Sequence, residues 1–250
     1  MQIPTGQLDT LRDGTRRLLD DALRAAGDSD AAPDPETGLP ALVAAFEQLF
    51  EVMARVEGDR EASGPQAPGT ATGDITELGE YAFKLHKDLG AHIEQAGLQE
   101  DRPLLTEQVI NFALWVTRRG GRIDTLEPVV DALAMVANNT ADASELESLS
   151  GIMGEIAAAV SPVIREDLEK INPGRPWRVL LLNNGIVATR SHNPDIMEAA
   201  FAVLTRHLPE DAARFFTEGM EQMEALDYPP QVRKVMEKYH RQWTANRSLH

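Results

Sequence analysis

Apolar residues recur every three or four positions along almost the whole chain, and this spacing is typical of amphipathic helices. No segment alternates apolar and polar residues as a half-buried strand does. Helices are predicted over residues 6–26, 40–57, 74–95, 104–119, 125–138, 144–171, 177–190, 194–207, 209–226 and 230–243. The expected fold is therefore all-α, with about nine to ten helices.

The helix predicted over 144–171 is the longest of the set and contains Pro162. Proline removes one backbone amide and clashes with the preceding turn, so we expect a kink there. The apolar positions of this helix follow a 3-4 spacing and comprise Leu146, Leu149, Met153, Ile156, Val160 and Val163.

Residues 58–73 (GDREASGPQAPGTATG) contain no large apolar side chain. Such a segment cannot bury enough surface to offset the entropy of ordering, so it is predicted to be a flexible linker. The expected organisation is a helical pair over 1–57, this linker, and an array of helical hairpins over 74–250.

The last four predicted helices repeat at a regular interval. First helices begin at 176 and 209, 33 residues apart, and second helices begin at 194 and 230, 36 residues apart. Two helices in each 33–36 residues, joined by short turns, are typical of stacked antiparallel helical hairpins in a solenoid-like array.

Trp177 with Leu180 and Leu181 matches the aromatic–leucine pattern that opens a tetratricopeptide repeat, and Ala200 supplies the small residue of its second helix. Residues 104–243 therefore resemble the tetratricopeptide-like class of α-solenoids. The resemblance implies a concave face that binds peptide segments of partner proteins.

Charge and composition narrow the possible partners. The 250 residues include 40 Asp and Glu against 24 Lys and Arg, a formal charge of −16, which argues against nucleic-acid and anionic-membrane binding. No cysteine is present, so disulfides, thiolate metal sites and a cysteine nucleophile are excluded. The sequence shows neither a leader-like start nor a long apolar run, and its arginine bias is typical of GC-rich bacteria. We expect a cytoplasmic bacterial protein.

Known catalytic and cofactor motifs are missing from the sequence. It has no glycine-rich phosphate loop, dinucleotide fingerprint or nucleophile elbow. Glu237 and His240 have the spacing of one half of a di-iron site, but the second half is lacking. We therefore predict no catalytic residue, cofactor or metal, while an acid–base site assembled from distant carboxylates stays open.

The first candidate binding feature is the turn Arg118-Arg119-Gly120-Gly121-Arg122, which leads towards the start of a helix. Arg118, Arg119 and Arg122 together with free amides suit a carboxylate or phosphate. In the alternative interpretation Gly120 ends one helix, and Arg118 and Arg119 sit favourably at its negative end.

The second candidate feature is the helix over 177–190. Asn184 lies in line with Trp177, and with Asn183 it is predicted to hold the backbone of a bound segment. Arg178 and Arg190 add charge selectivity. In the alternative, Asn184 satisfies a neighbouring polar group in the core.

These features predict a non-enzymatic protein–protein interaction module, a scaffold or adaptor. Two alternatives stay open: a structural helical bundle that works as a homo-oligomer, and an unrecognised small-ligand binder or enzyme.

Overall fold

The computed structural model describes residues 4–27, 38–63, 72–168 and 170–245, without the side chains of 59–63, 72 and 73. Regular structure within these residues consists of α-helices, one 3-10 helix and a single isolated bridge between Ile123 and Val160. The predicted all-α fold is confirmed, and the eleven α-helices observed are close to the predicted number.

The chain divides into two compact units. The N-terminal unit takes in residues 2–136 together with 159–161, and the C-terminal unit takes in 137–158 and 162–250. The predicted linker at 58–73 is not where this division falls, because the described helices on either side of it belong to the same unit.

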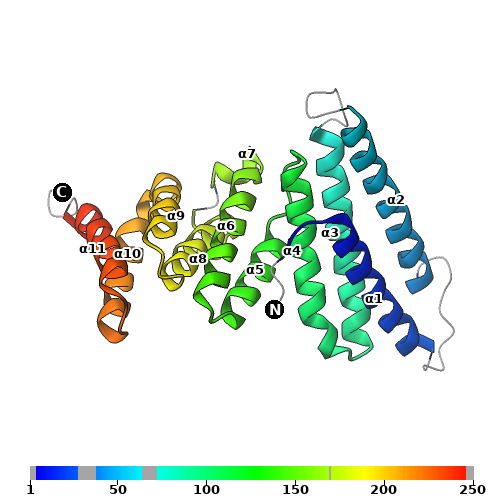
Figure 1. Ribbon diagram of the computed structural model, residues 1–250, viewed down its shortest axis with the longest axis horizontal. Coiled ribbons are helices and arrows are strands. Elements are labelled where there is room, and N and C mark those ends of the chain that lie inside the picture. Colours follow the sequence, from blue (N-terminus) through cyan, green and yellow to red (C-terminus); the bar gives the residue numbers. More distant parts are fainter. Residues whose placement is uncertain (1–3, 28–37, 64–71, 169, 246–250) are drawn as a thin grey trace. The chain divides into compact units, whose positions relative to one another are not determined.

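The N-terminal unit begins with four long helices and a short 3-10 turn. They are α1 (Leu8–Gly27), α2 (Leu39–Ser63), α3 (Thr72–Gln95), η1 (Gln99–Asp101) and α4 (Arg102–Arg118). The four α-helices run up and down in turn (Figure 1), with α1 against α2 and α4, and α3 against α2 and α4. Helix α5 (Glu127–Asn139) follows and continues just past this unit.

A core of large apolar side chains holds these helices together, as the 3-4 spacing of the sequence requires. Its fully buried members include Leu11, Leu18, Phe46, Leu49, Met53, Ile75, Leu89, Ile93, Phe112 and Trp115. The segment before α1 is fixed to α4, because Asn111 Oδ1 accepts hydrogen bonds from the amides of Thr5 (2.8 Å) and Gly6 (2.9 Å).

Glycines with a left-handed backbone end two of the helices. Gly97 follows α3 and Gly120 follows α4, both with positive φ, of 73° and 81°. The amide of Gly121 bonds to the carbonyl of Val116 (3.0 Å) and that of Gly120 to Thr117 (3.1 Å), which is the Schellman pattern.

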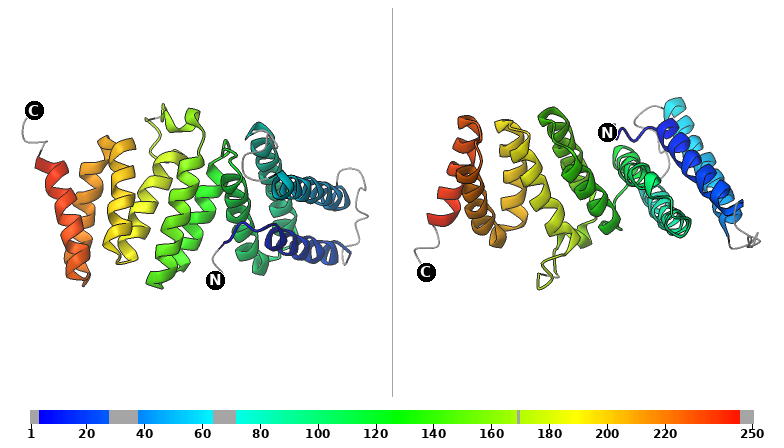
Figure 2. Two further views of the ribbon diagram at one scale, coloured as in Figure 1. Left: turned by 45° about the horizontal axis from the view of Figure 1, so that its top comes forward. Right: turned by 90° about the horizontal axis from the view of Figure 1, so that it is seen from below.

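The helices of the C-terminal unit are short and lie in pairs. They are α6 (Ala143–Ala159), α7 (Pro162–Arg165), α8 (Pro176–Arg190), α9 (Pro194–His207), α10 (Pro209–Ala225) and α11 (Pro230–Thr244). Helices α8 and α9 form one hairpin and α10 and α11 the next, and the two hairpins lie side by side in every view (Figures 1 and 2). The last four helices begin at proline, so the predicted 33- and 36-residue intervals are confirmed.

Aromatic rings and methionines fill the space between these hairpins. Phe201 lies between Phe215, Phe216 and Tyr239, with ring centroids 5.1–5.7 Å apart. Met197, Met223 and Met236 complete the same buried cluster.

The predicted helix over 144–171 is wrong beyond residue 159. Helix α6 ends at Ala159, because the chain there pairs with the backbone of Ile123. The carbonyl of Ala159 accepts a hydrogen bond from the amide of Ile123, and the amide of Ser161 donates to the carbonyl of Ile123 (both 3.0 Å). Pro162 then opens the separate short helix α7, where its missing amide costs nothing. Val163, predicted on the apolar face, is 74% exposed.

Both ends of the predicted 58–73 linker are helical. Helix α2 continues to Ser63 and α3 begins at Thr72, and the remaining residues of the linker, 64–71, lie outside the described residues.

Candidate protein-docking surface

The arginine turn after α4 is engaged in contacts within the chain. Arg118 donates to the carbonyl of Thr5. Arg119 pairs with Glu57 and lies over the ring of Trp115, 4.7 Å from its centroid. Trp115 Nε1 donates to the same carboxylate (3.0 Å). Two of the three predicted anion ligands therefore tie α4 to α2 and to the N-terminal segment.

Arg122, the third residue predicted in this turn, is exposed. Its amide donates to Thr76 Oγ1 (2.9 Å). Arg118 and Arg119 therefore bind different partners, Thr5 and Glu57, whereas Arg122 is exposed.

Two of the predicted binding residues of α8 are buried. Trp177 packs edge-on against His207, with ring centroids 5.3 Å apart. Asn184 Oδ1 accepts a hydrogen bond from Ser150 Oγ (2.6 Å), which joins α8 to α6. Neither side chain is presented on the surface, as the core interpretation of Asn184 expects.

The other predicted residues of α8 lie nearer the surface. Arg178 makes a forked ion pair with Asp211 on α10 (2.7–3.0 Å), 33 residues along the chain. Arg190 donates to the carbonyls of Ala137 (2.9 Å) and Thr140. Asn183 is half-buried. The arginines therefore stabilise the packing of neighbouring segments.

Three large aliphatic side chains stand out from the surface between α6 and α8. Val163, Leu168 and Ile171 are 74%, 80% and 99% exposed, whereas the other exposed large apolar residues of the described chain reach only 53%. We call these three residues the aliphatic triad. They lie on residues 162–175, the 162–175 loop, of which residue 169 is not described.

A buried ion pair links Asp167 of this loop to Arg175 at its end. Arg175 binds Asp167 through two hydrogen bonds, one of them from Nη2 to Oδ2 (2.8 Å), and both side chains are only 5–6% exposed. Arg175 also donates to the carbonyls of Asn172 (3.2 Å) and Lys170 (3.4 Å). Hydrogen bonding to Asp167 holds the pKa of Arg175 above its usual value. The loop is therefore closed around a charged centre.

A second layer of ion pairs joins the loop to the start of α10. Lys170 pairs with Glu210 (3.0 Å), and the Arg178–Asp211 pair lies beside it. Arg175 lies 3.8 Å from Glu210. The two acids are in the first turn of α10, where negative charge is favourable. These contacts fix the base of the loop on the hairpin.

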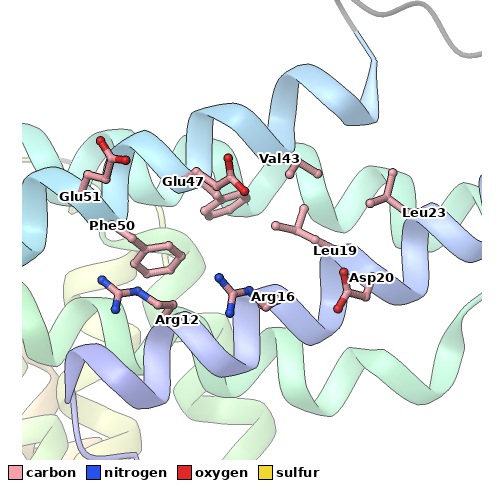
Figure 3. Close-up of a pocket in the computed structure, with 10 residues that line it drawn as sticks. Arg12, Arg16, Leu19, Asp20, Leu23, Val43, Glu47, Phe50 and Glu51 are labelled. Atoms are coloured by element: carbon pink, nitrogen blue, oxygen red, sulfur yellow. The ribbon is translucent and has the colours of Figure 1, made fainter.

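The N-terminal unit has a groove of about 370 Å³ between α1 and α2 (Figure 3). Its apolar lining consists of Leu19, Leu23, Val43, Phe46 and Phe50. Arg12, Arg16 and Asp20 line the α1 side, with Arg12 lying 5.9 Å from the ring centroid of Phe50. Glu47 and Glu51 line the α2 side. The groove suits a small apolar group that carries charges at its edges.

Among the described histidines, His86 has the most strongly shifted pKa, and it belongs to the core. His86 packs against Phe46 and Phe112 (ring centroids 5.3 and 4.7 Å), and its Nδ1 lies 3.2 Å from the carbonyl of Ala82. Burial lowers the pKa of His86 to about 4, so the ring is neutral at physiological pH. It is enclosed by apolar rings and does not face a groove, so it serves packing.

The described residues also bear on metal binding and on membrane crossing. No three His, Asp or Glu side chains there gather as ligands for a metal ion. None of the described helices is both long and apolar enough to cross a bilayer.

Sequence reasoning missed the aliphatic triad, because it placed residues 162–171 in a helix with Val163 on its buried side. A signal was present: Pro162 and Asn172-Pro173-Gly174 bracket the segment, and both are typical of breaks between helices. The exposure of Leu168 and Ile171 follows once the helix ends at residue 159.

No protein-family model, curated protein or solved structure matches this chain. The resemblance of residues 104–243 to tetratricopeptide-like repeats therefore rests on the hairpin spacing and on the residues around Trp177.

Proposed function

We propose that this chain is a non-enzymatic protein–protein interaction module, a scaffold or adaptor, whose docking element is the aliphatic triad. The observation that carries the proposal is the exposure of Val163, Leu168 and Ile171 on a loop held by a buried ion pair.

The energetics favour docking. Burying an exposed aliphatic side chain contributes roughly 1.5–3 kcal/mol, so three of them supply a useful part of a binding free energy. A mobile loop would lose much of that gain in the entropy of ordering. The Arg175–Asp167 pair restrains the segment between these two residues, so its docking is expected to cost less.

The hairpin array supports the same function. Helices α8 to α11 form a rigid base, and the Arg178–Asp211 pair joins its successive first helices. Exposed apolar side chains on a rigid base are typical of protein interaction sites.

Site-specific photo-crosslinking tests this proposal in cells of the source organism. A photoreactive amino acid at position 168 or 171 is expected to give a discrete protein adduct, identified by mass spectrometry. The same probe at Leu226, which is 53% exposed and lies away from the loop in the sequence, is the matched control. Adducts at all three positions alike, or at none, would contradict the proposal.

A further inference from the structure

The edge of the C-terminal unit that carries the aliphatic triad also carries the end of α9. Trp177, at the start of α8, packs against His207 in the last turn of α9, with ring centroids 5.3 Å apart. Lys170 of the loop pairs with Glu210 (3.0 Å), which is in the first turn of the helix that follows α9. The loop, the start of α8 and the end of α9 therefore meet at one place.

Two exposed arginines at this place are unpaired within the described part of the chain. Arg165 ends α7, and Arg206 is in the last turn of α9. Neither makes an ion pair or a side-chain hydrogen bond with another described residue. The cations at the base of the loop differ from them, because Lys170, Arg175 and Arg178 are each paired with an acid.

Both arginines act on the same imidazole ring. Burial lowers the pKa of His207, and the positive charges of Arg206 and Arg165 lower it further. The ring is therefore neutral at physiological pH, and the two guanidinium groups carry the positive charge. Glu166 is the one exposed acid among the described residues of the loop. Two unpaired arginines beside the triad thus stand against one exposed acid of the loop.

We infer that the partner of this surface is an acidic–aliphatic peptide segment: its aliphatic side chains pack on the triad, and its Asp or Glu side chains bind Arg165 and Arg206. This inference rests on the proposed docking role of the loop and gives the chemistry of its partner. Arginine binds carboxylates through paired, charge-assisted hydrogen bonds, so it gives direction to an apolar contact that has none. A chain with a formal charge of −16 repels acidic segments in general, so the two arginines select where such a segment docks.

Selection from a phage-displayed library of random peptides, with the full chain as bait, tests the inference. Peptides that bind the wild-type protein are expected to combine Leu, Ile or Val with Asp or Glu, and to be depleted in Lys and Arg. The most enriched peptide is then synthesised, and its affinity is measured by isothermal titration calorimetry. Leu168→Ser with Ile171→Ser is expected to weaken its binding about tenfold or more for each side chain.

Charge variants test the role of the arginines. Arg165→Glu with Arg206→Glu is expected to weaken binding of the peptide about tenfold or more, because two attractive contacts become repulsive. Lys234→Glu with Arg241→Glu makes the same change in net charge at exposed positions of α11. This control is expected to bind within about twofold of the wild type, since salt screens distant charges. Glu166→Gln is expected to tighten binding by up to about threefold, because it removes the acid next to Arg165.

Circular dichroism checks the fold of each variant. If Arg165→Glu with Arg206→Glu fails to fold, Arg165→Gln with Arg206→Gln replaces it, with Lys234→Gln and Arg241→Gln as its control.

Several results would overturn the inference. They are a selection that enriches no peptide or only peptides without Asp and Glu, an equal loss of affinity in the arginine variant and its control, and a weaker binding by Glu166→Gln. The crosslinks in cells separate this failure from that of the proposed function. An adduct at position 168 with a partner segment that lacks Asp and Glu would remove the acidic partner and leave the interaction module in place. An absence of any adduct at positions 168 and 171 would remove both.

Discussion

At the scale of single residues, the conformation of the 162–175 loop depends on the Arg175–Asp167 ion pair. Both side chains are nearly inaccessible to water, and the guanidinium also binds two carbonyls of the loop. A buried ion pair adds little to the free energy of unfolding compared with an apolar replacement of both partners. The loss of one partner alone, however, leaves an uncompensated buried charge.

Replacement of Arg175 by Met is therefore expected to lower the free energy of unfolding by about 3 kcal/mol, because Asp167 is left buried and unpaired. Urea unfolding followed by circular dichroism measures this loss. Arg241→Ala removes an exposed pair with Glu237 and is expected to change stability by less than about 0.5 kcal/mol. Equal effects of the two substitutions would contradict the structural role of the buried pair.

His86 makes stability depend on pH in a predictable direction. The unfolded chain binds a proton at this ring below about pH 6.5, whereas the folded chain does so only below about pH 4. The contribution of the neutral ring is therefore complete above pH 6.5 and is lost as pH falls towards 4.

Replacement of His86 by Leu is expected to remove the pH-dependent part of the free energy of unfolding that this ring contributes. Between pH 7 and pH 5 the free energy of unfolding should fall by about 2 kcal/mol more in the wild-type protein than in the variant. Urea unfolding at both pH values measures this difference. The comparison between the two proteins cancels the titration of the carboxylates that they share. Parallel pH profiles of the two proteins would show that His86 takes up its proton equally well in the folded chain.

At the scale of elements, the sequence predicted most helices closely because their signals are local. The apolar spacing and the prolines at 176, 194, 209 and 230 define α8 to α11 without reference to the rest of the fold. The end of α6 depends instead on pairing between Val160 and Ile123, which are distant in sequence. That pairing could not be read from the helical pattern of 144–171.

The difference between local signals and long-range packing also explains where the predicted site residues lie. Trp177 and Asn184 were predicted to share one face of a helix, but packing decides whether that face is buried, and here both are. The exposure of the triad depends on the end of α6 at residue 159 and on the Arg175–Asp167 pair, and the helical pattern of 144–171 predicts neither.

The glycines give a test of helix boundaries. Gly120 has a φ of 81° at the end of α4, and a methyl group there would meet no neighbour, so Gly120→Ala measures backbone strain alone. Gly120→Ala is expected to lower the free energy of unfolding by about 1 kcal/mol.

Gly154→Ala is the matched control within α6, where an added methyl group is equally free of neighbours. This substitution is expected to raise the free energy of unfolding by about 0.5–1 kcal/mol, because alanine favours the helix. Chemical denaturation of the two variants checks both signs. A gain at Gly120 would contradict the assigned end of α4, and a loss at Gly154 would contradict the helical conformation of that residue in α6.

At the scale of the whole molecule, the chain has two compact units and a formal charge of −16. The C-terminal unit carries the aliphatic triad, and the N-terminal unit carries the α1–α2 groove.

Hydroxyl-radical footprinting of the dilute monomer tests the central claim, the outward display of the triad, most directly. Leu168 and Ile171 are expected to be modified faster than Leu226, which is 53% exposed, and far faster than the buried Leu180. Modification of Leu168 and Ile171 at the rate of Leu180 would contradict the account, since the loop would then have no exposed apolar group with which to dock.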